Sequence, residues 1–174
     1  MPDRRQARLF IFPIMVSILL LLVVGCGTKE EPAMPETMPA DFEFSVRYGI
    51  TSKNAINTFE DKVTKDLVSD GTITVDLAFS ETEMRSIYDR MRELNVLRDL
   101  KLESRIKNCF QTPFTEDYWK IQMNGETRIF HWSEENCSLT KDAAKLKELR
   151  EFVHMIVSAQ KVYTDLPKAK GGYH

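Results

Sequence analysis

The dipeptide Asn124-Gly125 restricts the fold of this chain more than any other feature, because alternating segments flank it. Apolar and polar residues alternate over 118–123 and again over 127–132. Asn-Gly is a preferred two-residue hairpin turn, since both positions tolerate a positive φ. Such a turn places Asp117 opposite Trp132. One face, expected to form the core, then carries Trp119, Ile121, Met123, Phe130 and Trp132. The other face carries Tyr118, Lys120, Gln122, Thr127, Ile129 and His131.

Three upstream segments show the same period of two, which indicates strands with one buried face. Residues 42–48 alternate without interruption. Residues 57–68 are interpreted as one long strand that twists or bulges. The turn at Asp70-Gly71 then leads into the clearest strand, at 73–79.

Two segments have the period of amphipathic helices. Ser80 and Glu83 match a capping box, and the helix they begin is expected to end near residue 94. The last helix is expected to begin near residue 140 and to end near residue 163, before Pro167. Residues 95–116 are compatible with either a short helix or an irregular loop.

The front of the chain is an export signal rather than an element of the fold. Residues 9–24 are apolar except for a proline and a serine, and Arg4, Arg5 and Arg8 precede them. The run Val23-Val24-Gly25-Cys26 resembles the lipobox of bacterial lipoproteins. This resemblance implies cleavage after Gly25 and a diacylglyceryl group on the thiol of Cys26. The alternative is an uncleaved signal anchor, although the stretch is short for a spanning helix, which needs about 20 residues.

The sequence therefore divides into four parts. The signal peptide covers 1–25, and the lipidated cysteine with a Pro/Glu-rich tether covers 26–40. One α+β domain is expected over 41–167, and a flexible tail over 168–174. The element order β-β-β-α-β-β-α favours a mainly antiparallel sheet of about five strands with two amphipathic helices packed on one face. At about 3.1 Å per residue, the tether could hold the domain roughly 40 Å from the bilayer.

The charge balance limits the classes of partner. The 24 basic and 26 acidic residues give a net charge of −2, and three of the arginines lie in the signal peptide. A mildly acidic domain is a poor match for nucleic acid, which requires a basic surface. We expect a monomer that contacts the membrane through its N-terminal acyl chains and binds no nucleic acid.

Two cysteines remain besides Cys26, and we expect them to form a disulfide. Cys109 and Cys137 bracket the Asn124-Gly125 hairpin, and continuing the ladder would bring these positions close together. Exported proteins retain disulfides because their compartment is oxidising. Two free, buried thiols are the alternative.

No motif typical of catalysis is present in the sequence. It has no G-x-S-x-G, H-E-x-x-H, P-loop or dinucleotide glycine pattern. No two of His131, His154 and His174 have metal-ligand spacing, so we expect neither a metal nor a cofactor. His131 could act as a base or ligand beside Glu134 and Glu135, but a half-exposed sheet histidine is the simpler interpretation.

Several short segments behind Cys26 carry a second resemblance. They are residues 44–49, Asp66 with the Asp70-Gly71 turn, Thr112-Pro113, residues 132–137, Leu166-Pro167 and residues 171–173. With these segments the mature chain is similar to small lipoproteins of Bacillus-type bacteria, a family without an assigned activity. The resemblance implies an α+β fold and the cysteine pair, and it implies nothing catalytic.

The sequence favours a lipid-anchored binding or interaction module on the extracytoplasmic face of the cell membrane, or at an outer membrane in a Gram-negative envelope. Its expected binding surface is the outer face of the last hairpin, with Tyr118, Lys120 and His131, together with the 95–116 segment. One alternative is an envelope hydrolase with a site around His131, Glu134 and Glu135, which would require a cleft that also gathers Asp117. Another is a structural or stress-related lipoprotein.

Overall fold

The computed structural model describes residues 32–106 and 108–174. The signal peptide, the cleavage site after Gly25 and the predicted lipid attachment at Cys26 lie outside the described residues. The elements are β1 (Glu43–Ile50), β2 (Asn54–Asn57), β3 (Lys62–Asp66), β4 (Thr72–Asp76), α2 (Glu81–Leu94), β5 (Thr115–Met123), β6 (Glu126–Ser133), α3 (Lys141–Ala159) and α4 (Lys161–Thr164).

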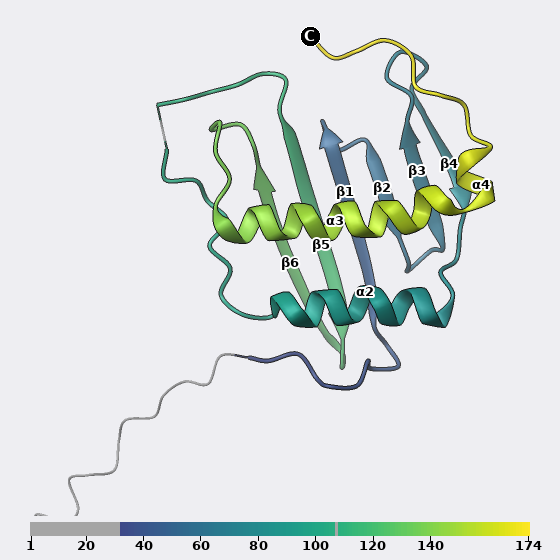
Figure 1. Cartoon of the computed structure of the whole chain (residues 1–174), viewed down its shortest axis with the longest axis vertical. Coiled ribbons are helices and arrows are strands. Elements are labelled where there is room, and N and C mark those ends of the chain that lie inside the picture. The colour runs from purple at the N-terminus through teal and green to yellow at the C-terminus, as the bar shows by residue number, and fades with distance from the viewer. Residues whose placement is uncertain (1–31, 107) are drawn as a thin grey trace, which may run out of the picture. The chain divides into compact units, whose positions relative to one another are not determined.

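The strands form one six-stranded antiparallel sheet in the order β4-β3-β2-β1-β5-β6. Helices α2 and α3 run side by side across one face of this sheet (Figure 1). The predicted α+β class is confirmed, with six strands in place of about five. The predicted hairpin register is also confirmed, since Asp117 pairs with Trp132 and Met123 with Glu126.

The extra strand arises because the prediction of one strand over 57–68 is wrong. The chain reverses between β2 and β3, and Asp61 adopts a φ of 51° in the turn. Thr58 at the start of this turn is tied to β1, because its hydroxyl accepts from the N–H of Phe44 at 2.8 Å and donates to the carbonyl of Phe44 at 3.0 Å. No Gly or Pro marks this turn, so the residue pattern alone did not reveal it.

Both helices begin as the sequence predicts. Ser80 and Glu83 form the expected capping box at the start of α2, and the hydroxyl of Thr140 accepts from the N–H of Ala143 at the start of α3. The last helix is shorter than predicted, because Gln160 takes an extended conformation and separates α3 from α4. Among residues 32–106 and 108–174, no helix is long and apolar enough to cross a membrane.

The hydrophobic core lies between the sheet and the two helices. The central strands contribute the bulky side chains of Phe44, Val46, Trp119, Ile121 and Trp132, each no more than 2% exposed. The helices oppose them with Ile87, Met91, Leu146, Val153 and Val157. All five apolar residues predicted for the inner face of the hairpin belong to this core or pack against it.

Both ends of the described chain pack on the domain, which corrects two sequence boundaries. The expected tether instead joins the domain from residue 32 onward, where Met34 is buried in the core and Tyr88 donates to the Pro35 carbonyl at 2.7 Å. Lys170, in the expected flexible tail, forms an isolated parallel β-bridge with Val68. The Tyr173 hydroxyl donates to a carboxylate oxygen of Asp66 at 2.6 Å.

The segment between α2 and β5 is irregular, and a disulfide fixes its far end. Val96 is fully buried, whereas the residues that follow pack only partly against the core. Cys109 and Cys137 are joined, with their Cα atoms 5.8 Å apart. This is the pairing that the sequence predicts.

The disulfide is expected to contribute substantially to stability, because its 28-residue separation restricts the unfolded chain. In the chain-entropy model, a loop of this length corresponds to about 3–4 kcal/mol. The Cys109→Ser/Cys137→Ser double variant should unfold in urea with a correspondingly lower free energy than the oxidised wild type. Reductant should lower the wild-type midpoint and leave that of the double variant unchanged. Equal midpoints for oxidised wild type and double variant would contradict the prediction.

Candidate functional site

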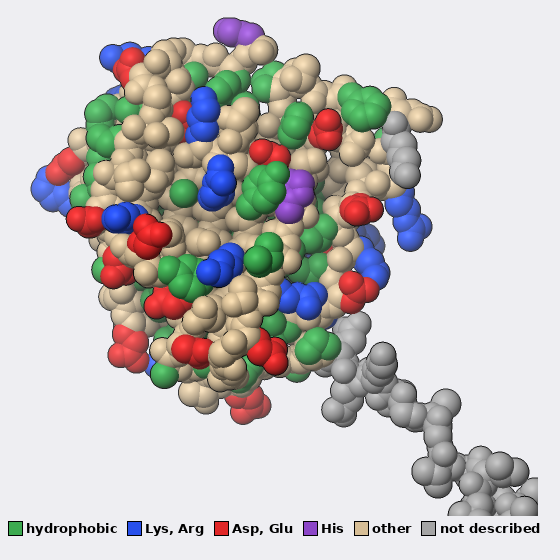
Figure 2. Space-filling view, turned by 180° about the vertical axis from the view of Figure 1, so that it is seen from behind, with side chains coloured by type: hydrophobic (Ala, Val, Ile, Leu, Met, Phe, Trp, Pro, Cys, Tyr) green, Lys and Arg blue, Asp and Glu red, His purple; other side chains and the backbone are tan. Residues whose placement is uncertain are grey.

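The face of the sheet opposite the helices is the candidate site, and we call it the open face. No described helix covers it, and cationic, acidic, hydrophobic and histidine side chains lie across it (Figure 2). The register places the three side chains predicted to form a binding surface together on this face, namely Tyr118, Lys120 and His131. Ile129 lies beside them and is 72% exposed, which is unusual for a large apolar side chain.

A stacked ring pair forms the centre of the open face. The rings of Tyr118 and His131 pair across β5 and β6 with their centroids 4.2 Å apart. Glu116 lies next to both, accepting from the Tyr118 hydroxyl at 3.2 Å and lying 3.6 Å from Nε2 of His131. Ser52 donates to the other oxygen of Glu116 at 3.1 Å. Burial, with Glu116 nearby, raises the pKa of the Tyr118 phenol, so this hydroxyl remains a donor.

Two cations flank the ring pair, and neither has a carboxylate partner among the described residues. Lys120 places its ammonium over the ring of Phe59, 4.3 Å from the centroid. Arg47 neighbours Tyr118 across β1 and β5 and forms no ion pair with any residue that the structure describes. The open face therefore offers aromatic surface and available positive charge side by side.

The residues of the alternative hydrolase site are not brought together. His131 points to the open face, whereas Asp117 is fully buried on the opposite side of the sheet. Glu134 accepts from Lys147 at 2.6 Å and from Thr115, and these bonds lower its pKa against the opposing effect of burial. Glu135 is exposed. Within the described ranges, no group of three His, Cys, Asp or Glu side chains could hold a metal ion.

A polar cluster lies instead on the helix-covered side, between β5, β1 and α3. Arg150 of α3 donates through Nε to Asp117 at 3.3 Å and places its guanidinium over the ring of Tyr48. The hydroxyl of Tyr48 lies 2.8 Å from Nδ1 of His154. The second oxygen of Asp117 has no hydrogen-bond partner in the described part of the chain.

Burial is the largest cause of the pKa shifts in this cluster. It raises the pKa of Asp117 to about 6, although the charge of Arg150 opposes the shift. Burial, together with Arg150 and Lys65, lowers the pKa of His154, which favours the neutral imidazole. The cluster therefore carries groups whose charge depends on pH, but it lies beneath α3 rather than in a cleft.

The sequence pattern predicts the hairpin part of the open face but not the rest. Arg47 belonged to a predicted strand, but nothing local indicated that β1 would lie beside β5. The pattern over 57–68 predicts a strand at Phe59, where the structure has a turn. The polar cluster did leave a signal, because Asp117 falls among apolar residues on the inner face, where a carboxylate needs a partner.

No family model matches the chain, and a comparison with curated proteins also finds no match.

The raised pKa of Asp117 predicts a stability contribution that falls as pH rises. Below about pH 4 the carboxyl is protonated in both states, so its contribution is fully present. Between pH 4 and 6 the unfolded chain releases this proton first, which costs the folded state about 2–3 kcal/mol. The stability of wild type relative to Asp117→Asn should therefore decline over this range in urea titrations. An exposed control, Asp76→Asn, reports the background, and a pH-independent difference for Asp117→Asn would contradict the prediction.

Proposed function

We propose that this protein is a lipid-anchored binding module of the bacterial cell envelope, and that its open face contacts the partner. The observation that carries this proposal is the one-sided covering of the sheet. Helices α2 and α3 bury one face, while the other presents stacked rings and cations that no described carboxylate neutralises. Exposed aromatic and cationic side chains that gather on one surface are typical of interaction sites.

The chemistry of the open face favours a partner with anionic groups. Arg47 and Lys120 are available for charge-assisted hydrogen bonds, which are stronger than neutral ones. Tyr118 and Ile129 supply apolar surface next to these cations. An acidic polymer or protein surface of the envelope matches this combination of positive charge and apolar surface.

Lipidation at Cys26 would hold residue 32, where the domain begins, close to the membrane. The domain begins to pack at residue 32, so only residues 27–31 separate the proposed anchor from it. At no more than about 3.6 Å per residue, this stretch reaches roughly 20 Å. The partner would then lie in the layer next to the bilayer rather than far from it.

The anchor is tested by a Cys26→Ser variant expressed in a bacterium. The wild type should fractionate with membranes and incorporate labelled palmitate. The variant should lose the label, because the acylated thiol is absent, and should no longer remain membrane-bound after signal cleavage. A wild type that incorporates no palmitate and keeps its full signal peptide would instead indicate an uncleaved signal anchor.

The open face is tested by charge reversal at Lys120. Residues 27–174, without the signal peptide, should sediment with purified envelope fragments, and binding should weaken as sodium chloride screens the charges. Lys120→Glu should weaken this binding at least about tenfold, or about 1.4 kcal/mol.

Lys168→Glu is the matched control, because it changes the charge equally on the tail and should leave binding unchanged. Equal losses for both variants would indicate a nonspecific charge effect. If the wild type binds and Lys120→Glu binds equally well, the open face does not contact the partner.

A further inference from the structure

We propose that the free edge of β6 binds an extended peptide of a partner protein as an added strand. This inference goes beyond the proposed function, because it needs neither the lipid anchor nor the side chains of the open face. Main-chain groups would supply the hydrogen bonds, as in other cases of strand addition to a sheet edge.

The hairpin register determines which backbone groups of β6 face outward. Asn124 and Gly125 both have positive φ, so the turn is the two-residue type whose flanking pair, Met123 and Glu126, exchanges both hydrogen bonds. Every second residue of β6 repeats that pairing. Ile129 and His131 therefore direct their N–H and C=O groups away from β5, and no backbone partner meets them in the described part of the chain.

The two edges of the sheet are protected to different degrees. Proteins usually block exposed edges with short strands, bulges, lysine or proline. The β4 edge is only five residues long. Beside it, Val68 forms a β-bridge with Lys170 near the end of the chain. The β6 edge is eight residues long, pairs with β5 one to one without a bulge, and contains neither lysine nor proline. An edge of this length, whose outward backbone groups have no described partner, suits strand addition.

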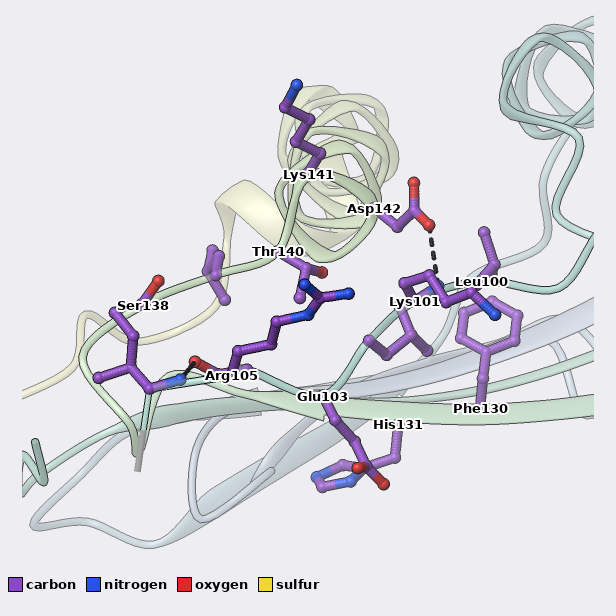
Figure 3. A pocket seen from close by; sticks show the side chains of 14 residues that line it. Leu100, Lys101, Glu103, Arg105, Phe130, His131, Ser138, Thr140, Lys141 and Asp142 are labelled. Atoms are coloured by element: carbon purple, nitrogen blue, oxygen red, sulfur yellow. Dashed lines mark hydrogen bonds between the residues drawn. The ribbon is translucent and has the colours of Figure 1, made fainter. Parts of the chain in front are cut away.

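A hollow lies where an added strand would enter. It has a volume of about 1030 Å³ and is lined by residues 100–106, by Phe130 and His131 of β6, and by residues 138–142. Figure 3 shows Phe130 and His131 pointing to opposite sides of β6, with Glu103 near His131. Residues 100–106 line this hollow together with β6, so an extended chain that entered it would contact both.

The lining indicates the side chains that the peptide would carry. Leu100, Leu102 and Phe130 provide apolar contacts. At the end of the hollow near the start of α3, Arg105 and Lys141 form no ion pair with any described residue, whereas neighbouring Asp142 is already bound by Arg98. The occupant that fits is an extended peptide with apolar residues and an acidic residue at the α3 end.

The test uses eight-residue peptides selected from a random phage-displayed library against residues 27–174. A selected synthetic peptide should bind the wild type, and Ile129→Pro should weaken it at least about tenfold. Proline removes only an outward-facing N–H here, and edge strands tolerate it in that orientation. Ile129→Thr is the matched control, because it also loses apolar surface but keeps the N–H, and it should retain affinity within about twofold.

Hydrogen exchange on the wild type provides a readout that does not depend on a variant folding. The peptide should slow exchange at the amides of Ile129 and His131, while the amide of Phe130, already bonded to β5, should change little. The proposal is overturned if no peptide is selected, if Ile129→Pro binds as well as wild type, or if these two amides stay unprotected.

If the wild type dimerises and Ile129→Pro abolishes the dimer, the edge binds a second copy. This result would also overturn the peptide proposal. Lys120→Glu should leave peptide binding intact. Failure of the edge and failure of the open face are therefore distinguishable.

Discussion

The two-residue turn between β5 and β6 is the constraint on which the rest of the structure depends. Asn124 and Gly125 hold the strands in one register, and the carboxylate of Asp41 reinforces the turn by accepting from both backbone N–H groups at 2.7 Å. A slip of one residue in either strand would turn its side chains to the opposite face. Lys120 would then lie beneath the helices and Trp119 in solvent, so the register creates the core and the open face together.

The same register places one carboxylate inside the core, and helix α3 supplies its cationic partner. Asp117 is buried opposite Trp132, where a lone charge would be strongly unfavourable. Arg150 reaches it from α3, while Tyr48 and His154 continue the polar contacts along the helix. Because a buried ion pair is weak evidence for stability, its clearer effect here is to specify how α3 is placed on the sheet.

Local patterns predicted the elements that local interactions determine. The hairpin register, the capping box at Ser80 and the cysteine pair all follow from neighbouring residues or a single ladder. The turn at Thr58 has no such signal, because its hydroxyl bonds to Phe44 on another strand. Likewise, Met34 and Tyr173 lie in polar segments that read as linker and tail, and only the assembled domain provides their contacts. For the site, local alternation identified the face of Tyr118 but not Arg47, which the pairing of β1 with β5 brings beside it.

The open face and the free edge meet at β6 but use different atoms of the same residues. Ile129 and His131 direct their side chains to the open face and their backbone groups to the edge. A peptide added at the edge would therefore extend the sheet without covering the stacked rings, and alternate peptide side chains would enlarge the open face. Two partners, or two parts of one partner, could occupy the domain together. Since the edge acts through main-chain hydrogen bonds and the face through charge, the two surfaces would recognise their partners independently of each other.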